Sequence, residues 1–164
     1  MRILILEDDP AMAACFRFNL AALAPDLDIA TCSDAVAAIS DLSAALPDLI
    51  LLDVLLPGPD GFTFLNELAS YSDTAAIPVI LISSLDLRTQ DLSHYGVRAI
   101  FSKDTLTPAT LQRTARELLH LPATPTPSNA PTSAAQPATT PSPEAATTPS
   151  PEAAAAPSPE AAHA

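Results

Sequence analysis

Three short, uninterrupted runs of aliphatic residues constrain the fold of this chain more than any other feature. They cover residues 3–6, 49–52 and 79–82, and polar residues follow each run at once. A strand with one face in solvent alternates apolar and polar side chains, whereas a strand that is covered on both faces is continuously aliphatic. The runs therefore predict an α/β architecture, in which helices cover both faces of a parallel sheet.

The segments between these runs carry the start signals of helices. Asp34 predicts an N-cap for a helix over residues 35–45, and Thr107 followed by Pro108 predicts the start of a last helix. The other expected elements are helices from Pro10, over residues 62–71 and over residues 86–94, and strands over residues 27–31 and 98–101. Five β-α units of roughly 20–25 residues imply right-handed crossovers and a doubly wound sheet.

The end of the chain has a different composition. Residues 121–164 hold 11 of the 18 prolines and no Lys, Arg, Ile, Val or aromatic residue, and an eight-residue unit recurs between residues 139 and 162. Such a segment buries too little surface to offset its chain entropy. We expect a domain over residues 1–120 and a disordered, extended tail over residues 121–164. The tail is interpreted as a solubilising segment, with docking to a proline-recognising partner or Ser/Thr-Pro modification as alternatives.

The charge and cysteine content exclude several classes of protein. A net charge of −12 argues against binding to nucleic acid or to an anionic membrane surface. No apolar run approaches the length of a membrane span, and acidic residues follow the first four apolar residues too soon for a secretory signal, so a cytoplasmic protein is expected. Cys15 and Cys32 are too few for a disulfide framework or a zinc site, and both are expected to be reduced and partly buried.

Polar residues stand at the ends of the predicted strands. They are Glu7, Asp8 and Asp9 after the first strand, Asp53 after the third, Ser83 after the fourth, and Ser102 and Lys103 after the fifth. In a doubly wound sheet, ligands bind at these carboxyl ends. Clustered carboxylates favour a hard divalent cation, and oxygen ligands favour Mg²⁺. With an ammonium and a hydroxyl close by, the set predicts a phosphoryl-transfer site with an aspartate nucleophile. Taken singly, each residue also fits a helix cap, a turn or an ordinary surface position.

The sequence with these residues resembles the receiver domain of bacterial two-component response regulators. The resemblance covers nearly all of residues 1–120. It rests on the segments at residues 3–10, 47–61 and 77–83 and on the Ser102-Lys103 step. It implies the flavodoxin-like fold, (βα)5 with strand order 2-1-3-4-5.

The resemblance also implies a role for each site residue. Asp53 would accept a phosphoryl group from a histidine kinase, Ser83 would be the switch hydroxyl, and Lys103 would contact the phosphoryl group. The implied Mg²⁺ ligands are Asp8, Asp53, the backbone carbonyl of Leu55 and, through a water, Glu7. Asp9 is assigned to the start of the first helix.

The sequence departs from the usual family pattern in three respects. Ile100 stands where an aromatic switch residue is usual, and alternation along the strand turns the adjacent Phe101 to the opposite face. Asp104 replaces a proline that often follows the lysine, so a trans peptide bond is expected there. Leu55 and Leu85 stand two residues after Asp53 and Ser83 and offer no group to orient an attacking water, which predicts slow autodephosphorylation.

We therefore interpret the chain as a stand-alone phosphorylation switch, and not as an enzyme acting on other molecules. Its expected partners are a sensor histidine kinase and an unknown downstream protein, or a second copy of itself. The alternatives are a scaffold that is never phosphorylated, an aspartate-nucleophile phosphatase and a flavodoxin-like cofactor binder. The phosphatase needs a general acid where this chain has Leu55. The cofactor binder needs a neutral, glycine-rich loop where this chain has three acids.

Overall fold

Five parallel strands form one sheet in the order β2-β1-β3-β4-β5. They are β1 (Arg2–Leu6), β2 (Asp28–Cys32), β3 (Leu49–Asp53), β4 (Val79–Ser83) and β5 (Val97–Ser102). The computed structural model describes residues 1–85, 87 and 91–122. The strand order confirms the flavodoxin-like sheet that the sequence predicted.

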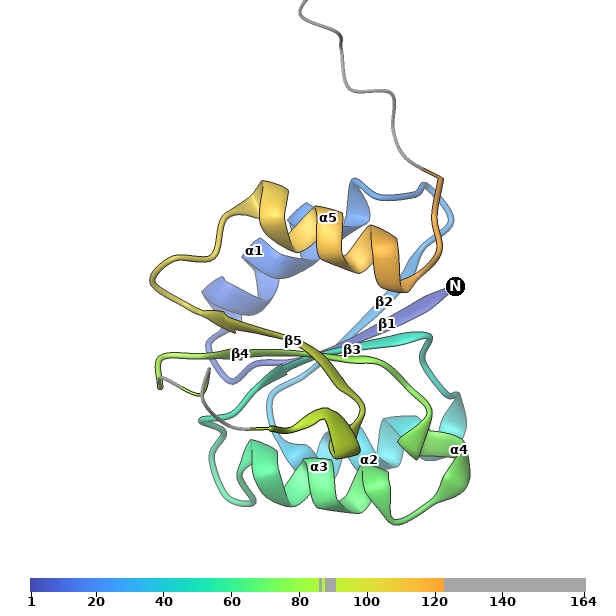
Figure 1. Cartoon of the computed structure of the whole chain (residues 1–164), viewed down its shortest axis with the longest axis vertical. Coiled ribbons are helices and arrows are strands. Elements are labelled where there is room, and N and C mark those ends of the chain that lie inside the picture. Colours follow the sequence, from blue (N-terminus) through green and yellow to red (C-terminus); the bar gives the residue numbers. More distant parts are fainter. Residues whose placement is uncertain (86, 88–90, 123–164) are drawn as a thin grey trace, which may run out of the picture. The chain divides into compact units, whose positions relative to one another are not determined.

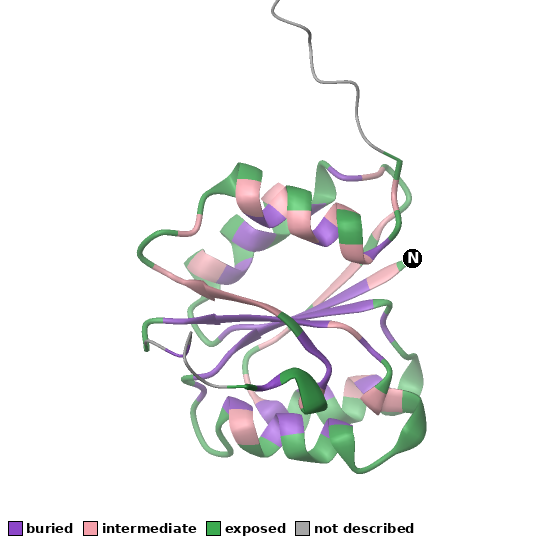
Figure 2. Ribbon diagram, viewed as in Figure 1, coloured by how far each residue is buried: buried purple, intermediate pink, exposed green. Residues whose placement is uncertain are grey.

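Helices cover both faces of the sheet, as the aliphatic runs require. Helices α1 (Pro10–Ala21) and α5 (Pro108–Leu118) lie on one face, while α2 (Ala35–Ala44), α3 (Gly61–Ala69) and the short α4 (Ser72–Ala75) lie on the other (Figure 1). The central strands β3 and β4 are buried along their whole length (Figure 2). Successive side chains of a strand therefore enter two separate cores, one on each face.

The helix starts are fixed by side-chain caps. Asp9 Oδ1 accepts a hydrogen bond from the Ala11 amide at 2.7 Å, and Asp34 Oδ1 accepts one from the Ala37 amide at 2.8 Å. Thr107 caps α5 ahead of Pro108, as its position in the sequence predicted. Each acceptor satisfies an amide of the first helical turn that has no partner within the helix.

The connection between β4 and β5 differs from the prediction. In its described part, residues 84–85, 87 and 91–96, the structure contains a 3₁₀ helix, η1 (Ser93–Tyr95), and no α-helix. The rest of the helix predicted over residues 86–94 lies outside the described residues. Asp91 Oδ1 accepts hydrogen bonds from the amide and the hydroxyl of Ser93, a local turn that competes with a helix. Gly96 then ends η1 with a φ of 78°, as expected of a C-cap glycine.

The two cysteines differ in exposure, although the sequence predicted that both are partly buried. Cys32 is half-buried, but Cys15, on α1, is exposed. The predicted disorder of the tail falls almost wholly on residues 123–164, which lie outside the described residues. Within the part of the chain that is described, no helix is long and apolar enough to cross a membrane.

Candidate functional site

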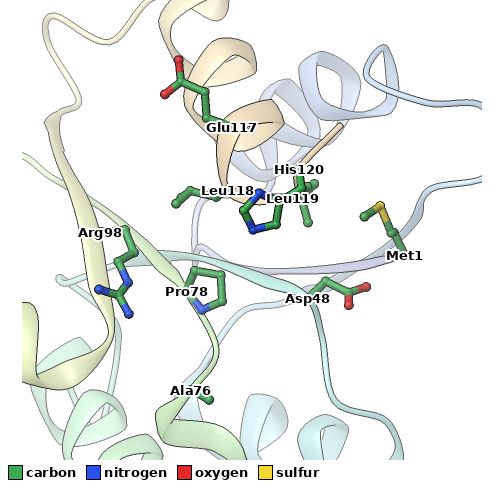
Figure 3. Close-up of a pocket in the computed structure, with 9 residues that line it drawn as sticks. All are labelled: Met1, Asp48, Ala76, Pro78, Arg98, Glu117, Leu118, Leu119 and His120. Atoms are coloured by element: carbon green, nitrogen blue, oxygen red, sulfur yellow. The ribbon is translucent and has the colours of Figure 1, made fainter. Parts of the chain in front are cut away.

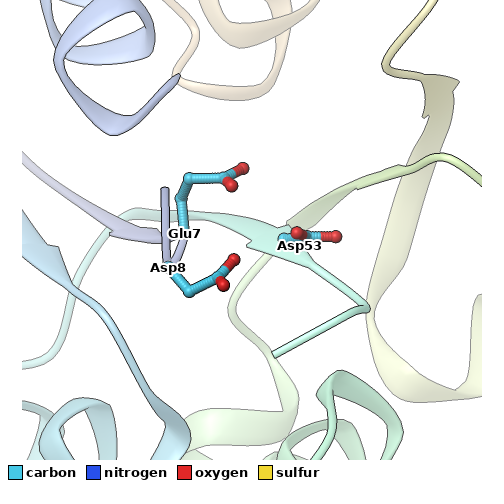
Figure 4. A group of neighbouring side chains, drawn as sticks. All are labelled: Glu7, Asp8 and Asp53. Carbon is cyan, nitrogen blue, oxygen red and sulfur yellow. The ribbon is translucent and has the colours of Figure 1, made fainter. Parts of the chain in front are cut away.

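The ends of β1 and β3 bring two carboxylates together. Leu6 pairs with Leu52 in the parallel register, so Glu7 and Asp53 follow at the same edge of the sheet. Both residues are buried. Figure 4 shows their side chains beside that of Asp8, which comes from the loop after β1 and is exposed. Side-chain oxygens of the three acids lie within 4.8 Å of one another.

Lys103 places its ammonium between the two buried carboxylates. Its Nζ lies 2.7 Å from Asp53 Oδ2 and 2.8 Å from Glu7 Oε1. The backbone amide of Lys103 donates to the Ser83 carbonyl at 3.0 Å, which anchors the residue at the end of β5 beside β4. The predicted convergence of Asp53 and Lys103 is therefore present in the structure.

These contacts shift the pKa values of the groups involved. Burial raises the pKa of the Glu7 carboxyl above its ordinary value, and the nearby Asp53 charge adds to that effect, although Lys103 opposes it. Burial alone lowers the pKa of Lys103, but the hydrogen bonds and charges of Asp53 and Glu7 outweigh it and raise that pKa. Two carboxylates against one ammonium leave an excess of negative charge at the site.

One oxygen of this cluster has no hydrogen-bond partner among the described residues. It is Glu7 Oε2, which is buried. A buried carboxylate oxygen without a partner is costly, and a cation bound among the three acids would satisfy it. An all-oxygen donor set is the kind that Mg²⁺ prefers, so the residues present fit that ion.

The loop after β3 is held close to Asp53. The Leu55 amide donates to Asp53 Oδ1 at 3.0 Å. A Cβ on Gly61 would lie 2.7 Å from Val54 Cα and 2.8 Å from the Asp53 carbonyl oxygen, so only glycine lets α3 start this close to the site. The tight start of α3 therefore helps to fix the position of Asp53.

Ser83 lies at the end of β4 and is completely buried. Its Oγ accepts a hydrogen bond from the Leu85 amide at 3.0 Å, so in this structure the hydroxyl is engaged within its own loop and not with Asp53. Leu55 and Leu85 are exposed by 49 % and 46 %. The residues that follow Asp53 and Ser83 by two positions thus present apolar surface to solvent.

The residues near Lys103 agree with the sequence analysis. Ile100 packs with the core on the α2 and α3 side, whereas Phe101 packs with the core on the α1 and α5 side. The predicted opposite orientation of the two side chains is therefore confirmed. No peptide bond between described residues is cis, so the bond from Lys103 to Asp104 is trans, as expected.

Cavities of similar size occur at both edges of the sheet. One of about 330 Å³ borders Glu7 and Asp8, on the side of β1 that faces β2. Another of about 450 Å³ lies at the opposite edge, lined by Met1, Asp48 and His120 among others (Figure 3). None of the predicted site residues lines the second cavity, so the volume of a cavity does not by itself identify the functional site.

The direct pairing of Glu7 with Lys103 is the feature that the sequence analysis missed. The sequence assigned Glu7 only a water-mediated role at a metal, and 96 residues separate it from Lys103. The buried position of Glu7 follows from the strand that precedes it, but nothing in the local sequence indicates its partner. The pairing becomes visible only when the sheet is assembled.

Comparison with known proteins gives one consistent result. The family model of the response regulator receiver domain matches residues 3–115. Response regulator PleD from Caulobacter vibrioides is 39% identical over 87 residues, which cover 53% of this chain. The alignment covers 19% of PleD, so this chain corresponds to only a part of that protein.

Solved structures of receiver domains share the fold. The signal receiver domain of a DNA binding response regulator from Colwellia psychrerythraea 34H has a TM-score of 0.66 and 29% identity, over 73% of this chain and 98% of that one. The receiver domain of a sensor histidine kinase from Pseudomonas aeruginosa PAO1 has a TM-score of 0.63 and 22% identity, over 73% and 97%. That second structure has a magnesium ion coordinated in its active site cleft.

Proposed function

Because this chain belongs to the response regulator receiver domain family, the phosphoryl-accepting switches of two-component systems, we propose that Asp53 is its phosphoryl acceptor. The observation that carries the proposal is the position of Asp53. It ends a buried central strand, and a lysine ammonium lies 2.7 Å from its Oδ2. An acceptor carboxylate needs such a cation, because negative charge accumulates on the phosphoryl oxygens during transfer.

The proposed reaction transfers a phosphoryl group from a phosphohistidine of a sensor kinase. An Asp53 carboxylate oxygen attacks phosphorus, a P–O bond forms as the P–N bond breaks, and the imidazole leaves. The Lys103 ammonium then moves from the Asp53 carboxylate to a phosphoryl oxygen. The displacement is short because Lys103 and Asp53 lie at the same edge of the sheet. The Ser83 hydroxyl, whose Oγ accepts from the Leu85 amide in this structure, would donate a hydrogen bond to a phosphoryl oxygen.

Mg²⁺ is the proposed cofactor. Asp8, Asp53 and the Leu55 carbonyl would bind it directly, and Glu7 would act through a water. When bound, the ion neutralises charge on the phosphoryl oxygens. The buried Glu7 Oε2, which has no hydrogen-bond partner among the described residues, and the close approach of the three acids support this assignment. A magnesium ion is present in the active site cleft of the Pseudomonas aeruginosa receiver domain, which has the same fold.

The remaining parts of the proposal concern partners and location. The phosphoryl donor is a sensor histidine kinase, and the output is contact with a downstream protein or a second copy of the chain. We propose no enzymatic activity beyond the chain's own phosphorylation and dephosphorylation, and a cytoplasmic location. The switch domain is assigned to residues 1–120 and the tail to residues 121–164.

Intact mass measurement tests the proposal. The full chain is incubated with acetyl phosphate and Mg²⁺, and a gain of about 80 Da, one phosphoryl group, is expected. The gain should require Mg²⁺ and should be lost in Asp53→Asn. Asp104→Asn, which removes an exposed acid beside Lys103, is the matched control and should keep the gain. An unmodified wild-type mass under these conditions, with the chain folded, would favour a receiver that only a kinase can phosphorylate or the scaffold alternative.

A further inference from the structure

The outer side of α2 and α3 carries an apolar groove that the phosphoryl site does not use. A cavity of about 270 Å³ is lined by residues of α2, α3 and α4 and of the segments next to them. These helices lie on the sheet face opposite α1 and α5 (Figure 1). Leu42 and Leu68 are buried at its base, while Ile39, Leu46 and Tyr71 line it as exposed side chains. The groove thus has a fixed apolar floor and an apolar rim open to solvent.

The exposure of this rim is high for large apolar residues. Tyr71 is 61 % exposed and Leu46 is 49 % exposed. Val36 lies one helical turn before Ile39 on α2 and extends the same apolar stripe. Contiguous apolar surface of this kind is typical of interaction sites, and a partly exposed aromatic residue is a common anchor in them.

The charge around the groove is of one sign. Its lining includes the exposed acids Glu67 and Asp73 and no basic residue. Arg2 reaches α2, but its Nη2 lies 2.7 and 2.8 Å from the two carboxylate oxygens of Asp41, which neutralises it there. The described lining of the groove therefore carries two acidic side chains and no basic one.

This charge selects among the occupants that an apolar groove can take. The chain's own tail carries Glu144, Glu152 and Glu160 and no Lys or Arg, so it has the same sign as the groove. A second copy would place acidic rims against each other, and an anionic membrane would also be repelled. A segment with apolar side chains flanked by Lys or Arg complements both the floor and the rim.

We propose that the groove between α2 and α3 docks a partner protein through a basic amphipathic helix. The apolar side of that helix fills the groove over Leu42 and Leu68, in contact with Tyr71, and its basic residues face Glu67 and Asp73. This surface is separate from the phosphoryl site, so the docking does not depend on the proposed role of Asp53. The groove would thus be an interaction surface in addition to the phosphoryl site, available whether or not the chain is phosphorylated.

The first test maps binding on the full chain. A synthetic helical peptide of about 18 residues, with Leu on one face and Lys on the other, is titrated into ¹⁵N-labelled protein, and amide shifts are expected in α2, α3 and α4. Tyr71→Ser should weaken binding about tenfold. Phe18→Ser removes an exposed aromatic residue from α1, on the opposite sheet face, and should leave the affinity unchanged.

The second test examines the charge. Glu67→Gln combined with Asp73→Asn should weaken binding, whereas Asp26→Asn, an exposed acid outside the groove, should not. A matched peptide with Glu in place of Lys should not bind, and added salt should weaken the Lys peptide.

Four results would overturn the proposal. The first is a set of amide shifts that map away from the groove, and the second is an equal loss of peptide affinity in Phe18→Ser and Tyr71→Ser. The third is binding of the Glu-containing peptide as tight as that of the Lys-containing peptide. The fourth is self-association of the chain that Tyr71→Ser abolishes. Mass gain from acetyl phosphate is measured on the same variants. It separates a failure of the groove from a failure of the phosphoryl site.

Discussion

Lys103 Nζ lies 2.7 Å from Asp53 Oδ2, although 50 residues separate the two in the sequence. The same ammonium contacts Glu7 Oε1 at 2.8 Å. Two buried carboxylates thus share a single cation, and the stability of this edge of the sheet depends on it.

Replacement of the lysine tests that dependence. Lys103→Met keeps most of the side-chain volume but removes the charge, so it should lower the free energy of unfolding by about 3 kcal/mol at neutral pH without Mg²⁺. Urea denaturation measures the change, and added Mg²⁺ should restore part of it. Arg98→Met, which removes an exposed cation from β5, the strand that precedes Lys103, should change it by less than about 0.5 kcal/mol. A Lys103→Met protein as stable as Arg98→Met would contradict the prediction.

Leu55 sets the expected lifetime of the phosphorylated state. It is exposed two residues after Asp53 and provides no polar group for an attacking water. Leu55→Asn should speed the loss of the phosphoryl group roughly three- to tenfold, the effect of one added hydrogen bond to that water. The measurement is the decay of phosphorylated mass after removal of acetyl phosphate. Val36→Asn, an exposed apolar residue on α2, should decay like the wild type, and equal decay of all three proteins would exclude the role of Leu55.

The two thiols should differ in reactivity. Burial raises the pKa of Cys32, and the charges of Asp41 and Asp34 act in the same direction, whereas Cys15 is exposed. Because the thiolate is the reactive form, iodoacetamide at pH 8 should modify Cys15 about tenfold faster than Cys32 in the native chain. Peptide mass spectrometry measures the two rates. In urea they should converge, and equal rates in the native protein would show that Cys32 is accessible.

The contribution of Asp60 to the stability of the fold should decrease as the pH falls. It caps α3, and hydrogen bonds from the Thr63 amide and hydroxyl lower its pKa from the ordinary value of 3.8. A lowered pKa stabilises the fold fully above 3.8, and that contribution is lost as the pH falls through the folded-state pKa. Asp60→Ala should therefore cost about 1 kcal/mol at pH 7 and less below pH 3.8.

Asp60→Asn is the matched control for the cap. It keeps the acceptor but does not titrate, so its stability relative to Asp60→Ala should not change with pH, whereas the wild type should lose stability relative to both variants as the pH falls through the Asp60 pKa. Denaturant unfolding between pH 3 and pH 7 measures both variants. A deficit of Asp60→Ala that grows on acidification would contradict the assigned sign.

The sequence predicted most of the fold because its signals are local. The aliphatic runs at residues 3–6, 49–52 and 79–82 marked buried strands, and the caps at Asp34 and Thr107 marked helix starts. The region between β4 and β5 was less predictable. There the turn made by Asp91 competes with helical periodicity, and neither signal dominates over so short a segment.

The sequence by itself determined which chemical groups stand at the strand ends, because a strand followed by Asp53, Ser83 or Lys103 can be recognised from neighbouring residues alone. Only the tertiary structure decided which groups meet. The pairing of Glu7 with Lys103, the burial of Ser83 Oγ against its own loop, and the groove between α2 and α3 all join segments distant in sequence or depend on packing. Strand order and helix packing set these contacts, and neither is encoded in any single stretch of the chain.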